Sequence, residues 1–372
     1  MQSIESIIKK ISFFDKNLVK KLISAHKALS ELKWVANILP NSSILVNTLS
    51  LQEAKSSSEV ENIITTQDDL FKSDHDKKKF SSIEAKEVYS YSEALYTWWE
   101  AVVKKKVILI NDLVKVQTII TNNDAWIRKW WDVKVVNVST WEVVYIPPQD
   151  PQEINKYLTE LENFVNDKDD EIDSLIKIAI IHHQFESIHP FFDWNWRTWR
   201  ILNILYLVLV WELDLPILYL SRYINRNKQE YYRYLQWVRT NWDWKSRIMF
   251  ILNWIEETSE LTILIINKIK ELMTKQKHLI RNSYPKIYSQ DLINNIFKHP
   301  YTKIEFLIRD LWCSRFSAWR TLKVLCSLWI LKKRKYEKKI IILIRNFLNY
   351  SKMYEQWVYK LNEQKMTISA RV

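Results

Sequence analysis

Apolar residues recur every three to four positions along much of this chain, which is the spacing of one face of an α-helix. The segments with this spacing are residues 18–32, 88–103, 152–165, 173–186 and 198–210. Segment 173–186 is apolar on most faces, as expected for a helix at the centre of a core. The pattern therefore predicts a mostly α-helical fold.

One short region has the alternation of a β-hairpin instead. Residues 132–138 and 142–146 alternate between apolar and polar side chains, and Ser139-Thr140-Trp141 between them predicts a turn. Pro147-Pro148 ends the second strand because proline cannot donate to a strand ladder. We expect a small hairpin within the helical fold.

The C-terminal part predicts a different unit. Helical segments are expected at residues 261–279, 291–297, 304–311 and 316–328, followed by strand-like segments at 329–331 and 339–344. Two helices around the short turn Trp312-Cys313-Ser314, followed by strands, predict a winged helix-turn-helix.

Positive charge is concentrated in the same part. Residues 262–372 contain 23 Lys and Arg against 7 Asp and Glu, whereas the whole chain has a net charge of +12. Arg315, Arg320 and Lys323 lie on the second of the two helices, and residues 332–335 lie in the wing. A basic helix and wing can neutralise DNA phosphates. A basic docking or dimerisation domain is the alternative, and a homodimer is left open.

Length and local composition predict the number of domains and the location of the protein. With 372 residues, the chain is expected to form three domains, at residues 1–110, 111–262 and 263–372. The apolar run 201–210 is too short to cross a bilayer, and the first residues lack the apolar region of a signal peptide. We expect a cytoplasmic protein without a membrane partner, whose two cysteines form no disulfide framework.

The densest group of reactive side chains is His189-Pro-Phe-Phe-Asp193-Trp-Asn195-Trp-Arg197-Thr-Trp-Arg200. An apolar helical segment follows at once, so this stretch predicts a loop that leads into a helix N-terminus. Free backbone N–H groups and the helix dipole favour a phosphate there, and a nearby histidine can act as a base.

This stretch resembles the Fic motif, HPFxDGNGRxGR, with Trp wherever the family has Gly. The resemblance implies a Fic-type helical core, in which the hairpin is a flap that holds a target segment by strand addition. It also implies an adenylyltransferase that moves AMP from ATP, with Mg²⁺, to a Ser, Thr or Tyr hydroxyl of a target protein. Self-modification is included among the targets.

The resemblance assigns a role to each matching position. His189 is the base, Asp193 holds Mg²⁺, and Phe191 is a buried anchor. The implied phosphate-binding positions are Asn195, the backbone at Trp194 and Trp196, and the two arginines Arg197 and Arg200. The family's phosphotransferase branch has Lys at the position of Trp196, so Gly there favours nucleotidyl transfer.

A second match lies in the N-terminal region. Ser57-x-x-x-Glu61-Asn62 fits the inhibitory pattern [S/T]xxxE[G/N] of Fic proteins. The resemblance implies that Glu61 pairs with Arg200. An arginine tied to a carboxylate cannot also hold a γ-phosphate. We therefore expect autoinhibition.

The glycine content explains the departures from the motif. A chain of this length should contain roughly 26 glycines, yet it has 0 Gly and 19 Trp. Trp141, Trp211 and Trp312 also lie where a turn or helix end favours Gly. We infer that many of these Trp residues are glycines in the cell, through a UGA codon that the organism decodes as Gly. Trp244 and one of Trp98 and Trp99 are the expected exceptions.

Two other interpretations remain. His182 and His183 could bind a metal together with His189 and Asp193, but the spacing fits no usual zinc pattern and leaves the arginines without a role. If the Trp residues are literal, their indoles block the phosphate loop. The chain would then be a DNA-binding winged-helix regulator with an inactive Fic domain, or with one that uses another donor.

Overall fold

The fold is that of a computed structural model, which describes residues 1–11, 15–39, 42–60, 83–121, 126–129, 132–136, 141–169, 171–218, 220–298, 301–336 and 339–344. These residues form two compact units. The first comprises Met1–Trp34 and Leu49–Thr262, and the second comprises Val35–Thr48 and Ile263–Val372. Residues 73–79, where a polar and charged stretch predicts a loop, lie outside the described residues.

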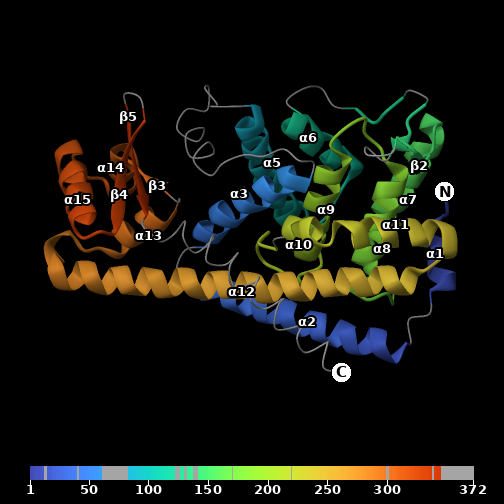
Figure 1. Cartoon of the computed structure of the whole chain (residues 1–372), viewed down its shortest axis with the longest axis horizontal. Helices are drawn as coiled ribbons and strands as arrows, with labels where there is room; N and C mark the ends of the chain where they lie inside the picture. Colours follow the sequence, from blue (N-terminus) through green and yellow to red (C-terminus); the bar gives the residue numbers. More distant parts are fainter. Residues whose placement is uncertain are drawn as a thin grey trace. The chain divides into compact units, whose positions relative to one another are not determined.

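The fold is mostly helical, as predicted (Figure 1). The helices before the hairpin are α1 (Ile4–Lys10), α2 (Lys16–Asn37), α3 (Ser43–Val60), α5 (Ile83–Lys105) and α6 (Ile110–Thr121). Those after it are α7 (Pro151–Asn166), α8 (Ser174–Ile188), α9 (Asn195–Leu209), α10 (Leu220–Arg226), α11 (Lys228–Asn241) and α12 (Trp244–Ser283). The predicted helix 261–279 is therefore the latter part of a longer one.

Helices α8 and α9 form the centre of the first unit. Almost every residue of both is buried, which explains why neither has a clear polar face. The Asp173 side chain caps α8 by accepting a hydrogen bond from the Leu175 N–H at 2.8 Å. Helices α5 and α7 pack beside this pair. The site residues at the end of α8 and the start of α9 therefore rest on a rigid core.

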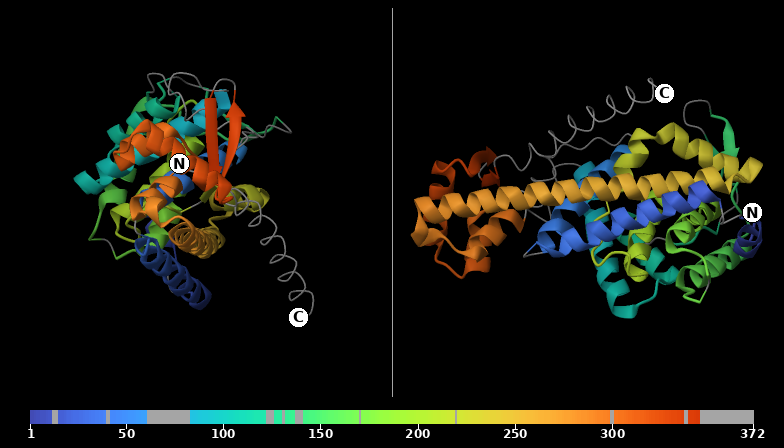
Figure 2. Two further views of the ribbon diagram at one scale, coloured as in Figure 1. Left: turned by 90° about the vertical axis from the view of Figure 1, so that its left-hand side faces the viewer. Right: turned by 90° about the horizontal axis from the view of Figure 1, so that it is seen from below.

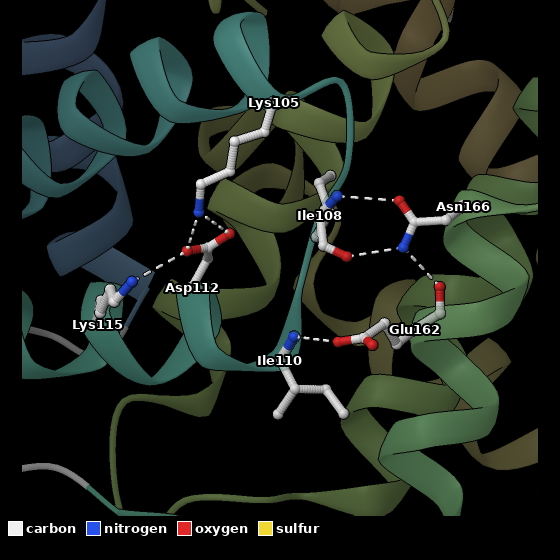
Figure 3. Close-up of polar contacts among 7 residues, drawn as sticks. All are labelled: Lys105, Ile108, Ile110, Asp112, Lys115, Glu162 and Asn166. Carbon is white, nitrogen blue, oxygen red and sulfur yellow. Dashed lines mark hydrogen bonds and ion pairs between the residues drawn. The ribbon is translucent and has the colours of Figure 1, made fainter.

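The connection between α5 and α6 is fixed to α7 by polar contacts (Figure 3). The Asn166 side chain accepts a hydrogen bond from the Ile108 N–H at 2.9 Å and donates one to the Ile108 carbonyl at 2.7 Å. The Glu162 carboxylate accepts from the Ile110 N–H, and Lys105 pairs with Asp112 at 2.8 Å. These contacts hold α6 beside α9, where α6 supports the candidate site.

The predicted hairpin is present and short. Strands β1 (Val135–Val136) and β2 (Val143–Tyr145) are antiparallel and lie at the outer edge of the unit in Figures 1 and 2. Residues 137–140 between them lie outside the described residues. The Gln149 side chain closes the base, because it accepts from the Asp132 N–H at 2.7 Å and donates to the Val133 carbonyl at 3.0 Å.

The second unit contains the predicted helix pair. Its helices are α13 (Gln290–Lys298), α14 (Ile304–Leu311) and α15 (Arg315–Ser327), and a 3₁₀ turn at Pro285–Ile287 precedes them. Strand β3 (Tyr301–Thr302) lies between α13 and α14, and strands β4 (Leu331–Tyr336) and β5 (Lys339–Ile344) follow α15. The strands form one antiparallel sheet in the order β3-β5-β4. The winged helix-turn-helix and the three domain boundaries stay predictions.

Several Trp residues have a backbone conformation that favours glycine. Among the described residues, nine have positive φ, and six of these are Trp: Trp141, Trp194, Trp211, Trp242, Trp312 and Trp329. Trp242 and Trp312 are left-handed C-caps of α11 and α14, where glycine is usual. Trp244 is the first residue of α12 and is 4% exposed. Positive φ thus marks six Trp positions that favour Gly, and Trp244 is not among them.

Helix α2 is held to the first unit by a histidine between two carboxylates. His26 Nε2 lies 2.9 Å from Asp173, and its Nδ1 lies 3.5 Å from Glu212. The hydrogen bonds to Asp173 and then Glu212 raise the pKa of His26 to about 10. The imidazolium therefore carries its charge across the physiological range.

This arrangement predicts a pH-dependent contribution to stability. A raised folded-state pKa gives stabilisation that is complete below the unfolded pKa of about 6.5 and disappears as the pH rises toward 10. We expect His26→Gln to be less stable than the parent at pH 6 and equal to it near pH 10, as measured by chemical unfolding. His278→Gln, at an exposed position on α12, is the control. A stability difference that does not change with pH would contradict this role.

None of the described helices is both long enough and apolar enough to cross a membrane. The cytoplasmic location stays a prediction.

Candidate functional site

The candidate base lies at the C-terminal end of the central helix. His189 caps α8 in the left-handed conformation, with φ 48° and ψ 60°. Its N–H donates to the Phe185 carbonyl at 3.0 Å, so the helix ends at this residue. A non-glycine residue in this region is strained, and such strain is commonly found at functional sites. The turn directs the chain from α8 into the motif loop, defined here as residues 189–195.

The surroundings of His189 keep its imidazole neutral. Burial, followed by the positive charges of Arg128 and Arg239, lowers the pKa of His189 to about 4. The ring therefore has an unprotonated nitrogen at neutral pH, as a general base requires. Its Nδ1 is buried and has no hydrogen-bond partner among the residues that the structure describes.

The motif loop is braced from inside by Asn195. The Asn195 side chain donates to the Phe191 carbonyl at 2.7 Å and accepts from the Phe191 N–H at 2.9 Å. Phe191 is 2% exposed, which suits its predicted role as an anchor. From α6, Gln117 donates to the Asp193 carbonyl at 2.7 Å and accepts from the Thr198 hydroxyl at 2.7 Å. Asn195 thus shapes the loop backbone around the predicted phosphate site.

The predicted magnesium ligand is exposed at the outer side of the loop. The Asp193 carboxylate accepts a hydrogen bond from the Trp194 N–H at 2.7 Å. Among the described residues, no group of three or more His, Cys, Asp or Glu side chains converges as a metal site would require. A cation at Asp193 would therefore need further oxygen ligands, and phosphates supply such ligands.

Both motif arginines project from the first turns of α9 and are fully buried. Arg197 pairs with Glu87 of α5 at 3.2 Å. Arg200 donates at 2.8 Å to the Ser221 hydroxyl, which in turn donates to Glu53 of α3. The N-terminal helices therefore hold both arginines through carboxylates.

The indoles of the motif lie against these guanidinium groups. The Trp194 and Trp196 rings have their centroids 3.5 Å and 4.7 Å from the Arg197 guanidinium carbon, and Trp196 lies 4.2 Å from that of Arg200. Two guanidiniums, a helix N-terminus and an exposed carboxylate are a donor set that fits a magnesium triphosphate. The fit requires Gly at Trp194 and Trp196, since the indoles cover the faces that phosphates would contact.

The inhibitory pattern is described only in part. Ser57 is buried in α3, whereas Glu61 and Asn62 lie outside the described residues. Asn225 donates at 2.8 Å to the carbonyl of Ser56, so the end of α3 is attached to α10 close to this pattern. The predicted contact between Glu61 and Arg200 stays a prediction.

The neighbouring histidines have structural surroundings. His182 is 0% exposed, its Nε2 lies 3.0 Å from the Tyr231 hydroxyl, and its ring stacks on Trp199 at 3.7 Å. His183 packs edge-on against Trp244. Both rings therefore lie in the core of the first unit.

Sequence reasoning missed four side chains at the site: Glu53, Glu87, Gln117 and Arg128. Arg128 is fully buried and contacts the backbone of residues 188–190. Each of the four lies far from the motif in sequence and belongs to no short pattern. The one available signal was Glu53, only four residues before Ser57 and therefore on the same helix face.

Comparison with known proteins shows the family of this chain. Three family models match the chain: "Fic/DOC family N-terminal" at residues 19–99, "Fic/DOC family" at 109–207, and "Protein adenylyltransferase SoFic-like, C-terminal domain" at 272–346. Together they cover more than half of the sequence, and the chain belongs to the Fic/DOC family. The matches support a Fic-type transferase.

Solved structures share the fold at low sequence identity. A Fic family protein from Desulfovibrio desulfuricans has a TM-score of 0.55 and 17% identity, over 89% of this chain and 96% of that one. Fic-1 from C. elegans has a TM-score of 0.51 and 19% identity, over 66% and 70%. A Fic domain containing signaling protein from Bacteroides thetaiotaomicron has a TM-score of 0.50 and 17% identity, over 66% and 97%.

Proposed function

We propose that this protein is an adenylyltransferase that transfers AMP from ATP to a Ser, Thr or Tyr hydroxyl of a target protein. One observation carries the proposal. His189, whose imidazole is kept neutral by its surroundings, lies at the end of α8. A loop of a few residues connects it to the start of α9, where the two buried arginines lie. A base beside an anion site is the arrangement that nucleotidyl transfer to a hydroxyl requires.

In the proposed reaction, His189 accepts the proton of the target hydroxyl as its oxygen attacks the α-phosphorus. A new phosphorus–oxygen bond forms to the target, and the bond to the departing pyrophosphate breaks. Arg197 and Arg200 hold the negative charge of the leaving phosphates, because guanidinium groups bind phosphate oxygens through paired hydrogen bonds. Asp193 would hold Mg²⁺, which supplies further positive charge to those phosphates.

The decisive experiment uses a glycine-restored protein, defined here as the chain with Gly at Trp141, Trp194, Trp196, Trp199, Trp211, Trp242, Trp312 and Trp329. This protein, also carrying Glu61→Ala, is incubated with Mg²⁺ and α-labelled ATP in a cell lysate. Label on protein supports the proposal and gives the targets by mass, including the enzyme itself. An absence of label from a folded protein, with parallel tests of other nucleoside triphosphates, would point to another donor or to loss of transfer.

We further propose that Glu61 inhibits the enzyme by pairing with Arg200. The support is that α3 already places one carboxylate near this arginine, since Glu53 reaches it through Ser221. In this proposal α3 presents Glu61 to the same guanidinium and leaves the γ-phosphate without its partner.

Glu61→Ala is therefore expected to raise the transfer rate of the glycine-restored protein by about 10-fold or more, which corresponds to the loss of one charge-assisted contact. The measurement is the initial rate of label transfer at fixed ATP. Glu31→Ala removes an exposed carboxylate from α2 and is the matched control. An equal or lower rate in Glu61→Ala would contradict autoinhibition by this residue.

A second candidate function rests on the C-terminal unit. Arg315, Arg320 and Lys323 are exposed on α15, whereas Ala318 and Leu322 are buried on its other side. Such a helix suits contact with DNA phosphates. A gel shift on duplex DNA that weakens steeply with salt, from a protein without transferase activity, would favour a DNA-binding regulator with an inactive Fic domain. A shift together with transfer would mean that one chain has both functions.

A further inference from the structure

Arg128 makes an unusual set of contacts for a fully buried arginine. It lies just before the hairpin and is 0% exposed. Its Nε donates to the His189 carbonyl at 2.8 Å, and its Nη2 donates to the Ile188 carbonyl at 3.3 Å and also to the Pro148 carbonyl. Its backbone N–H donates to the Pro190 carbonyl at 2.9 Å. One residue thus binds three consecutive carbonyls of the turn that carries the candidate base.

These contacts stabilise an otherwise unfavourable conformation of the turn. The last carbonyls of a helix have no partner within the helix, and they carry its negative dipole end. The guanidinium supplies both hydrogen bonds and positive charge to the end of α8. It also offsets the strain of His189, whose left-handed φ of 48° is unfavourable for a residue with a Cβ atom.

The same arginine joins this turn to the hairpin. The Pro148 carbonyl, which accepts from Arg128, belongs to the segment that follows the second strand, Val143–Tyr145. A separate link lies nearby, since the Tyr145 hydroxyl donates to the Ser187 carbonyl at 3.1 Å. The Arg239 guanidinium lies 3.8 Å from the centroid of the Tyr145 ring and donates to the Ser187 hydroxyl at 3.4 Å. The hairpin and the end of α8 therefore form one connected body.

We propose that Arg128 is a positioning residue, which fixes the imidazole of His189 relative to the hairpin so that a hydroxyl presented at the hairpin edge meets the base. This inference rests on the proposed transfer reaction. The outward side chains of the hairpin fit the role of a docking edge, since Val143 and Ile146 are 50% and 56% exposed. In this role Arg128 does not touch the substrate: it acts through the backbone of residues 188–190 and of Pro148, and a lysine at this position would keep its charge beside His189.

The geometric demand explains why an arginine is needed. A lysine keeps the charge but presents a single nitrogen, and it cannot bind carbonyls in several directions. A displacement of a reacting group by about 1 Å can lower a rate by about 100-fold. In the glycine-restored protein carrying Glu61→Ala, we expect Arg128→Lys to lower kcat for label transfer by about 100-fold while the Kd for ATP changes by less than about 2-fold.

The matched control is Arg247→Lys. Arg247 is also 0% exposed, but it makes no contact with the carbonyls of residues 188–190. We expect it to lower the melting temperature with little change in kcat below that temperature. If Arg128→Lys retains the parental kcat, or if Arg247→Lys loses as much kcat as Arg128→Lys, the positioning role is wrong.

Amide hydrogen exchange tests the inference without relying on activity. In Arg128→Lys, we expect faster exchange at the amides of His189 and of residues 143–145 together, with the amides of α7 unchanged. Acceleration at only one of the two places would overturn the coupling. If Arg128→Lys fails to fold, Tyr145→Phe removes the neighbouring link alone, and it should give the same joint acceleration to a smaller extent.

Different results would refute the proposed transfer reaction and the proposed role of Arg128. A parent protein that transfers no label refutes the proposed reaction, whereas the exchange result still decides whether Arg128 couples the hairpin to the turn. A parent that transfers label, with an unaffected Arg128→Lys variant, leaves the reaction intact and refutes the coupling.

Discussion

Replacing His189 with Ala in the glycine-restored protein that carries Glu61→Ala is expected to lower the rate of AMP transfer by about 10²- to 10⁴-fold, the usual contribution of a general base. The reason lies in the pKa. Burial and two arginines lower the pKa of His189 to about 4, so at pH 7 nearly every molecule has a ring nitrogen ready to accept a proton. Alanine offers no replacement, and the hydroxyl would have to attack while still protonated.

The matched control for this variant is His182→Ala. His182 is 0% exposed and its Nε2 lies 3.0 Å from the Tyr231 hydroxyl, a contact that involves none of the restored positions, so its loss should lower the melting temperature. We expect His189→Ala to keep the parental melting temperature and lose transfer, and His182→Ala to show mainly a loss of stability. Transfer that persists in folded His189→Ala, measured with α-labelled ATP, would show that another group is the base.

Some parts of this structure could be predicted because their causes are local. The repeat of apolar residues located α7, α8 and α9 to within a few residues, and Asp150 and Asp173 mark the starts of α7 and α8 as N-caps. Helix α9 begins at Asn195 rather than at 198, because the first turn lies within the motif and is held by the contact between Asn195 and Phe191.

The supports of the site could not be predicted, because their causes are tertiary. Arg128 binds backbone carbonyls about 60 positions away. Every residue has a backbone carbonyl, so the sequence does not indicate which carbonyls a side chain binds. Glu53 and Glu87 resemble ordinary helix carboxylates until the fold places them beside Arg200 and Arg197. A motif thus predicts which groups react, while the groups that orient them become visible only in the folded chain.

The N-terminal helices link these observations to regulation. Arg197 is paired with α5 and Arg200 is connected to α3, so both arginines that we propose to bind phosphate are held by helices outside the motif. Displacement of α3 would release Glu53 together with the segment that leads to Glu61. Regulation through this helix would then act on the arginines directly, without any change in α8 or α9.

The second large effect is a rise in stability, expected when Trp is replaced by Gly at the positions with positive φ. In the part of the chain that the structure describes, six Trp residues have positive φ, and each costs about 1 kcal/mol relative to glycine in that conformation. Their combined cost of about 6 kcal/mol is comparable with the entire stability of a typical protein, about 5–15 kcal/mol. Trp312 and Trp141 are also 94% and 78% exposed, so burial of the indole offers no compensation there.

We therefore expect a chain with Gly at these six positions alone to melt more than about 10 °C above the chain with Trp there. Trp244→Gly is the matched control, since Trp244 is buried at the start of α12 and its loss should lower the melting temperature instead. Mass spectrometry of the peptide spanning residues 189–200 from the native organism gives the direct answer. Glycine at positions 194, 196 and 199 would open the phosphate site, whereas Trp at all three would leave the guanidinium faces covered and favour the regulator without transferase activity.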